Sequence, residues 1–137
     1  MTRIRVVLAE DHPEMALQLC ALLASEYEVH VVPDGRALMA AVDQEMPDII
    51  ISDIRMPGLD GLAAALNIHA KHPEVPFIFV SVQGDPAVIR RALVDGARGY
   101  VIKSDAGNEL ASAVEAVLGG GHYLSFSARG ALRNERV

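Results

Sequence analysis

The chain has 137 residues, a formal net charge of −6 and a hydrophobic content of 51%. This content excludes a disordered chain, and the length suits a single domain with a sizeable core. The 12 lysines and arginines are spread along the chain, which argues against nucleic-acid binding by this segment alone, because duplex binding depends on clustered basic side chains.

Features that would direct the chain out of the cytoplasm are not evident. No apolar run approaches the roughly 20 residues of a membrane span. The basic start at Arg3 and Arg5 leads into a short apolar run that meets Glu10 and Asp11, which is unlike a signal peptide. The single cysteine, Cys20, cannot form an internal disulfide and lies in an apolar helical pattern, as a small core residue does. Together these features favour the cytoplasm.

Short apolar runs alternate along the chain with longer segments in which apolar residues recur at the spacing of an α-helix. The run at residues 49–51 shows no polar alternation, which is typical of a strand that is covered on both faces. The predicted strands are residues 4–9, 27–32, 49–53, 76–81 and 100–103. The predicted helices begin near Pro13, Asp34, Asp60, Asp85 and Ala106, and the last ends at glycines 119–121. This strict alternation predicts an α/β fold with a parallel sheet, right-handed crossovers and helices on both faces.

Four of the predicted strands end in polar residues that can take part in chemistry. These are Glu10 and Asp11 after the first strand, Asp53 at the third, Ser81 at the fourth and Lys103 at the fifth. The carboxyl ends of parallel strands share one edge of the sheet, and open α/β sheets bind their ligands at that edge. We therefore expect three carboxylates, a hydroxyl and a lysine to lie together.

This combination of residues favours phosphoryl transfer. Clustered carboxylates repel one another and need a cation, and ligation by oxygen alone favours Mg²⁺ or Mn²⁺. A carboxylate can also attack phosphorus and become an aspartyl phosphate, whose oxygens Lys103 and Ser81 could contact. We interpret Asp53 as the acceptor, because an acid that closes a buried strand needs a partner. Taken singly, Asp11 and Ser81 could be capping residues and Lys103 a surface lysine, so the prediction rests on the set.

At these residues the chain resembles the receiver domain of two-component response regulators, from Ile4 to about Ser125. The resemblance lies in the segments "VVLAEDHPEM", "DIIISDIRMPGLDG", "PFIFVSVQGD" and "GARGYVIKSD". It implies the flavodoxin-like fold, with five parallel strands in the order 2-1-3-4-5 and helices on both faces. Two positions depart from the commoner pattern, with Glu10 in place of Asp and Ser81 in place of Thr.

The resemblance also implies roles for individual residues. The implied Mg²⁺ ligands are Glu10, Asp11, Asp53 and the main-chain carbonyl of Arg55. Asp53 would accept a phosphoryl group from the phosphohistidine of a sensor histidine kinase and lose it by autodephosphorylation, without acting as an enzyme on other substrates. Ser81 and Lys103 would contact the phosphate, and Tyr100, at the family's aromatic switch position, would turn inward. The surface around the fourth helix, fifth strand and fifth helix would then change, and a homodimer could form.

The end of the chain looks most like the NarL/LuxR-type subfamily, in "GARGYVIKSD…EL…AV…VLGGGHYLS". Members of this subfamily usually carry a linker and a helix-turn-helix DNA-binding domain after the receiver. We expect the receiver to span 1–121 and residues 122–137 to form a linker toward an output domain that this chain is too short to contain. Any DNA binding and control of transcription would come through that domain. The last nine residues, 129–137, are expected to be a solvated tail.

Other functions fit the sequence less well. A stand-alone receiver is the alternative to a fragment, and a degenerate receiver that acts by protein contacts alone would not need the complete set of acids, hydroxyl and lysine. A magnesium-dependent phosphatase usually has a second acid two residues after its nucleophile, where this chain has Arg55. A flavodoxin-like cofactor module would have its cofactor phosphate repelled by the acidic first loop. The histidines, including His69 and His72, do not suggest a metal site.

Overall fold

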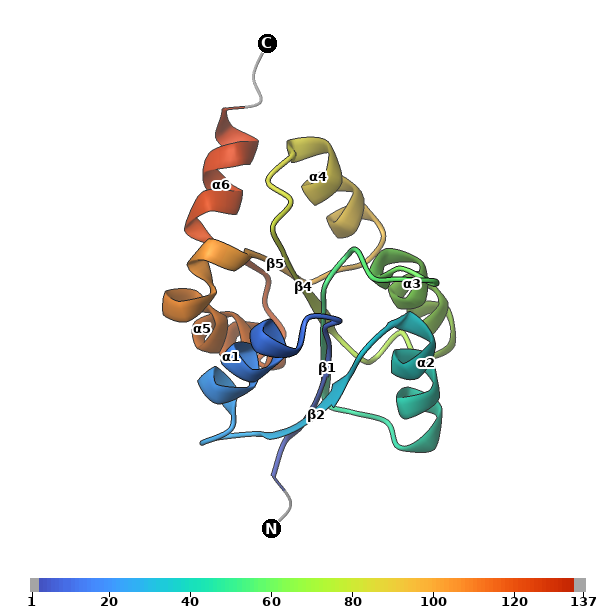
Figure 1. Ribbon diagram of the computed structural model, residues 1–137. Helices are drawn as coiled ribbons and strands as arrows, with labels where there is room; N and C mark the ends of the chain where they lie inside the picture. Colours follow the sequence, from blue (N-terminus) through green and yellow to red (C-terminus); the bar gives the residue numbers. More distant parts are fainter. Residues whose placement is uncertain (1–2, 135–137) are drawn as a thin grey trace.

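A computed structural model describes residues 3–134 of the chain, which form a six-stranded parallel sheet flanked by helices (Figure 1). The strand order is β2-β1-β3-β4-β5-β6. The strands are β1 (Arg5–Ala9), β2 (Glu28–Val32), β3 (Ile49–Ser52), β4 (Phe77–Ser81), β5 (Gly99–Ile102) and β6 (Tyr123–Leu124). The predicted α/β class and the order of the first five strands are confirmed, and β6 is an addition.

Helices cover both faces of this sheet (Figure 1). The helices are α1 (Pro13–Leu23), α2 (Gly35–Gln44), α3 (Gly61–Lys71), α4 (Pro86–Val94), α5 (Ala106–Leu118) and α6 (Phe126–Arg133). Helices α1 and α5 lie on one face, α2, α3 and α4 lie on the other, and α6 packs against α4 and β5. Within residues 3–134, each helix is too short or too polar to cross a lipid bilayer.

Aspartates begin three of the helices, as the sequence predicts. The side chain of Asp34 accepts a hydrogen bond from the main-chain N–H of Ala37, at 2.8 Å. Asp60 and Asp85 form equivalent caps at the starts of α3 and α4. Each cap satisfies a main-chain donor that has no partner inside its helix, and so fixes where the helix begins.

The core consists of two apolar layers, one on each face of the sheet. Val6 and Leu8 of β1 point into the layer beneath α1 and α5, whereas Val7 and Ala9 point into the layer beneath α2, α3 and α4. Successive strand residues face opposite sides. Because both sides are covered, every residue of β1 after the first is apolar and buried, which is the pattern the sequence shows.

The solvated tail expected over 129–137 is wrong for residues 129–133, because these belong to helix α6. Tyr123 and Leu124 pair in parallel with Gly99 and Tyr100, and α6 follows from Phe126 to Arg133. Ala128 on α6 is fully buried in the same layer as Tyr100. Residues 135–137 lie outside the described residues. The domain boundary at 121 stays a prediction.

A glycine allows the loop after β3 to return closely past that strand. The Gly61 N–H donates to the Ile54 carbonyl at 2.8 Å, and a Cβ atom at position 61 would overlap the main-chain carbonyl oxygen of Asp53. We expect Gly61→Ala to lower the free energy of unfolding by about 1–3 kcal/mol, since the backbone beside it must move. Urea unfolding followed by circular dichroism measures this. Gly107→Ala in α5 is the matched control, because a Cβ there meets nothing within 4 Å and should stabilise the helix; equal effects of the two substitutions would contradict the prediction.

Candidate functional site

The strand register brings the predicted site residues to one edge of the sheet. Ala9 pairs with Ser52, so the residues that follow them, Glu10 and Asp53, are neighbours. On the other side of the site, Ser81 of β4 pairs with Ile102 of β5. Lys103, the residue after Ile102, therefore lies next to the end of β4. Glu10, Asp53 and Ser81 are all buried. The structure therefore places the three predicted strand ends, together with Lys103, where the sequence expects them.

The Lys103 ammonium connects the two neighbouring acids. Its Nζ atom lies 2.8 Å from Glu10 Oε1 and 2.8 Å from Asp53 Oδ2, and the three side chains are 9%, 1% and 9% exposed, respectively. Burial opposes the charge on Lys103, but hydrogen bonds to Asp53 and Glu10 and the charges of both acids outweigh burial and raise its pKa. The lysine is thus held as a cation between two carboxylates.

A histidine that sequence reasoning missed joins the acids of the first loop. His12 donates its main-chain N–H to Glu10 Oε2 at 3.1 Å, and its ring Nδ1 lies 3.2 Å from the same oxygen and 3.3 Å from Asp11 Oδ1. One ligand atom from each of Glu10, Asp11 and His12 lies within 4.8 Å of the others. The sequence signal was the position of His12 directly after Glu10 and Asp11.

The acidic loop suits a hard cation. The Oδ1 atom of Asp11 is buried, and its contact among residues 3–134 is the His12 ring Nδ1 at 3.3 Å. Carboxylate oxygens are the donors that Mg²⁺ prefers. The compact group does not include Asp53, whose Oδ2 contacts Lys103 and whose Oδ1 accepts a long hydrogen bond, 3.4 Å, from the Arg55 N–H. The metal set of Glu10, Asp11, Asp53 and the Arg55 carbonyl stays a prediction.

Ser81 and Tyr100 are linked through Gln83. The Ser81 hydroxyl accepts a hydrogen bond from the Gln83 N–H at 3.1 Å, and the Gln83 carbonyl accepts one from the Tyr100 hydroxyl at 2.8 Å. The inward turn of Tyr100 on phosphorylation stays a prediction. Its side chain is already fully buried, because it packs in the layer that α4 and α6 complete.

Comparison with known proteins identifies the family of this site. The family model for the response regulator receiver domain matches residues 6–115. The chain belongs to this family. Among characterised relatives, it is 33% identical to the transcriptional regulatory protein MctR of Rhizobium johnstonii, over 98% of this chain and 64% of that protein. It is 30% identical to the probable transcriptional regulatory protein NarL of Mycobacterium tuberculosis, over 82% of this chain and 53% of that protein.

A solved structure extends the comparison to the subfamily. The crystal structure of a LuxR-family two-component response regulator from an Aurantimonas species superposes with a TM-score of 0.92 at 27% identity, covering 98% of this chain and 99% of that one. Together with the NarL relative, this similarity places the receiver in the NarL/LuxR type. The chain spans only 53% to 64% of the length of the first relatives it matches.

Removing the Lys103 ammonium should destabilise the protein, because Glu10 and Asp53 would then repel each other. We expect Lys103→Met to lower the free energy of unfolding by about 3–5 kcal/mol at neutral pH without divalent metal, because it leaves two buried carboxylates unpaired. Urea unfolding measures the loss, and Lys71→Met, at an exposed lysine, is the control. Since the folded pKa of Lys103 is raised, the stability it contributes is present below its ordinary value of 10.5 and is lost as the pH rises through the folded value. An equal loss in both variants would contradict the pairing.

Tyr100 should also affect stability in alkaline solution. Burial raises the pKa of Tyr100 to about 12; the hydrogen bond with Ser81 opposes this shift, and the charges of Asp53 and Asp85 add to it. The stabilisation linked to its proton is therefore present below the ordinary value of 10.0 and is lost as the pH rises toward 12.

We expect Tyr100→Phe to cost about 1 kcal/mol at neutral pH, because the Gln83 carbonyl loses its donor. The variant should also lose less stability than wild type between pH 10 and 12. Unfolding measured across this range tests both points. Tyr27→Phe is the control, since the Tyr27 hydroxyl makes no hydrogen bond in the described part of the chain. A neutral-pH loss no larger than that of the control would argue against the contact.

Proposed function

We propose that this receiver is a phosphorylation switch in which Asp53 accepts a phosphoryl group from the phosphohistidine of a sensor histidine kinase. The observation that carries the proposal is the buried Lys103 ammonium, 2.8 Å from both Asp53 and Glu10. A fixed cation beside a carboxylate is what phosphoryl transfer requires, because the reaction depends mainly on positioning and charge neutralisation.

The two oxygens of Asp53 have different surroundings. Oδ2 is held by Lys103, while Oδ1 accepts only the long hydrogen bond from Arg55, within the described residues. In our proposal Oδ1 attacks phosphorus, the N–P bond of the phosphohistidine breaks, and the electron pair returns to the imidazole nitrogen of the kinase. Lys103 then holds a phosphoryl oxygen by charge.

The acidic loop provides the rest of the charge balance. Glu10, Asp11 and Asp53, with the Arg55 carbonyl, would hold Mg²⁺, which when bound neutralises charge on the phosphoryl oxygens. The closeness of ligand atoms from Glu10 and Asp11, within 4.8 Å of each other, supports this ligand set. Both Lys103 and the metal would neutralise the charge of the acids. Lys103, which follows β5, would do so for Glu10 and Asp53.

The hydrogen bonds of Gln83 would link a change at Asp53 to the loop before α4 and to Tyr100. A phosphoryl group on Asp53 would attract the Ser81 hydroxyl, which already accepts the Gln83 N–H. A change at Ser81 therefore alters the loop before α4 and the carbonyl that Tyr100 binds. Because α6 packs on α4 and β5, the surface formed by α4, β5 and α5 would shift between two states together with α6.

The names of the relatives indicate what such a switch would control. Several are named transcriptional regulators, and this chain spans about half to two thirds of their length. We propose that the switch controls transcription through a helix-turn-helix DNA-binding domain outside these residues, with homodimer formation on phosphorylation. A receiver that works by protein contacts alone would instead need no phosphoryl group on Asp53.

The proposed acceptor can be tested by intact-protein mass spectrometry. Wild type incubated with phosphoramidate and Mg²⁺ should gain the mass of one phosphoryl group, whereas Asp53→Asn should gain none, because an amide cannot act as the nucleophile. Asp43→Asn, at an exposed position on α2, is the matched control and should gain the group as wild type does.

Two further conditions separate the roles at the site. Omission of Mg²⁺ with chelator should abolish the gain if the acids hold a required ion, and Lys103→Met should weaken any downstream change in size-exclusion behaviour. A phosphoryl gain that persists in Asp53→Asn would assign the acceptor elsewhere. The absence of any gain in wild type would favour a receiver that works by protein contacts alone.

A further inference from the structure

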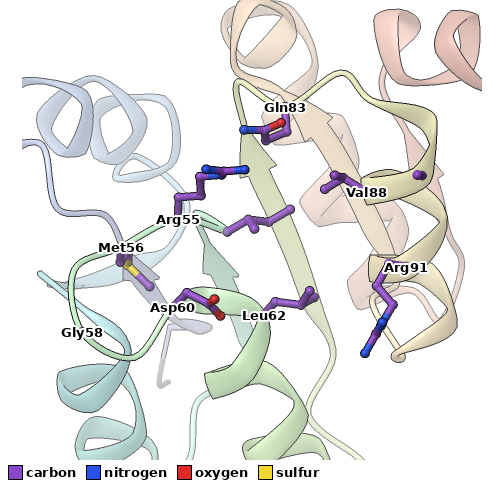
Figure 2. Close-up of a pocket in the computed structure, with 10 residues that line it drawn as sticks. Arg55, Met56, Gly58, Asp60, Leu62, Gln83, Val88 and Arg91 are labelled. Carbon is purple, nitrogen blue, oxygen red and sulfur yellow. The ribbon is translucent and has the colours of Figure 1, made fainter.

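A pocket lies beside the proposed phosphorylation site, between the loop after β3, the start of α3, and α4 (Figure 2). Its volume is about 560 Å³, which is within the range of small-molecule sites. Asp53, Ser81 and Lys103 do not line it. The pocket is thus distinct from the acids and lysine described above, although it shares a wall with the loops that carry them.

The packing of the helices explains why this space is open. Helix α3 packs against α2, whereas α4 packs against β5 and α6, so α3 and α4 diverge. Leu62 on α3 and Val88 on α4 face the space and are only partly buried, and Ile54 lines it between them. The result is an apolar wall with no side chain of the described residues filling it.

One end of the pocket is polar and cationic. Figure 2 shows the side chains of Arg55 and Gln83 together at this end. Arg55 is exposed and has no ion-pair partner among residues 3–134. The other arginine of the lining, Arg91, is bound through its Nε to Asp95 at 2.8 Å. The lining also contains the carboxylate of Asp60, whose Oδ1 accepts the Ala63 N–H at 2.8 Å as the cap of α3. Arg55 is the cation that this pocket offers to a ligand.

We propose that the pocket binds a small organic carboxylate with an apolar body. The carboxylate would lie on the Arg55 guanidinium, whose planar set of donors matches two carboxylate oxygens, with the Gln83 amide as a further donor. The apolar body would cover the partly exposed Leu62 and Val88 and lie against the buried Ile54. A bare inorganic anion would leave that wall uncovered, and a neutral apolar molecule would gain nothing from Arg55. This binding can be measured on the unphosphorylated protein, so its failure is distinguishable from a failure of the proposed phosphoryl transfer.

The test uses sodium octanoate as the probe, with 1-octanol and acetate as partial analogues. Each is titrated into ¹⁵N-labelled wild-type protein, without phosphodonor or divalent metal, and Kd is fitted from amide shifts. We expect saturable shifts for Gln83, Leu62 and Val88 with octanoate, and weaker binding of octanol and of acetate. Octanol binding as tightly as octanoate would remove the role of Arg55, and octanoate shifts confined to other surfaces would overturn the site.

Matched variants separate the charged end from the apolar wall. Arg55→Gln should raise the Kd of octanoate about fivefold, the upper range for an exposed ion pair, and leave octanol unchanged. Val88→Gln should weaken both ligands by about tenfold, because it removes apolar contact. Arg36→Gln, at an exposed arginine outside the pocket, is the control and should match wild type. An octanoate Kd unaffected by Arg55→Gln would refute the proposal.

A second copy of the chain is the competing occupant of this surface. Sedimentation of wild type at the concentration of the titration distinguishes the two. A monomer that binds octanoate supports the small-ligand site. A dimer that Val88→Gln dissociates would overturn it, since the apolar wall would then be a protein interface.

Discussion

The contact of Lys103 with Glu10 and Asp53 is the interaction on which the rest of the site depends. Two carboxylates at the ends of neighbouring buried strands repel each other, and without a cation the edge formed by β1 and β3 would be unfavourable. Lys103 begins the short 3-10 helix that directly follows β5, and from there its long side chain reaches both acids at the ends of β1 and β3. The strand order therefore determines which groups neutralise one another, and the strand register fixes their distances.

The position of Lys103 depends in turn on residues beyond the part of the chain that matches the family model, which ends at residue 115. The Ile102 N–H donates to the Ser125 hydroxyl at 3.1 Å, and Asp105 accepts hydrogen bonds from Ser127. Lys103 lies between these two anchors. The β6–α6 segment thus forms hydrogen bonds on both sides of the turn that carries the lysine, and so connects α6 to the position of Lys103.

Local signals made most of the fold predictable. Apolar runs indicated the buried strands, aspartates indicated the helix starts, and the polar strand ends indicated the site. The segment β6–α6 was not predictable in this way. A two-residue strand has no periodicity, and the arginines of α6 interrupt the apolar pattern by which a helix is recognised. Its start is fixed by distant side chains, since Glu109 on α5 accepts the Phe126 N–H at 3.0 Å. The burial of Tyr100 depends on the same segment, because α6 completes the layer around it.

Gln83 joins the two functions proposed for this edge of the molecule. Its N–H binds the Ser81 hydroxyl, its carbonyl binds the Tyr100 hydroxyl, and its side chain lines the pocket beside Arg55. A phosphoryl group on Asp53 would act on Gln83 through Ser81, and a carboxylate in the pocket would act on it through its amide. Two ligands that displace one residue are energetically coupled, and the coupling must be equal in both directions. A carboxylate bound at Arg55 would also add negative charge near Asp53, so that this coupling opposes phosphorylation.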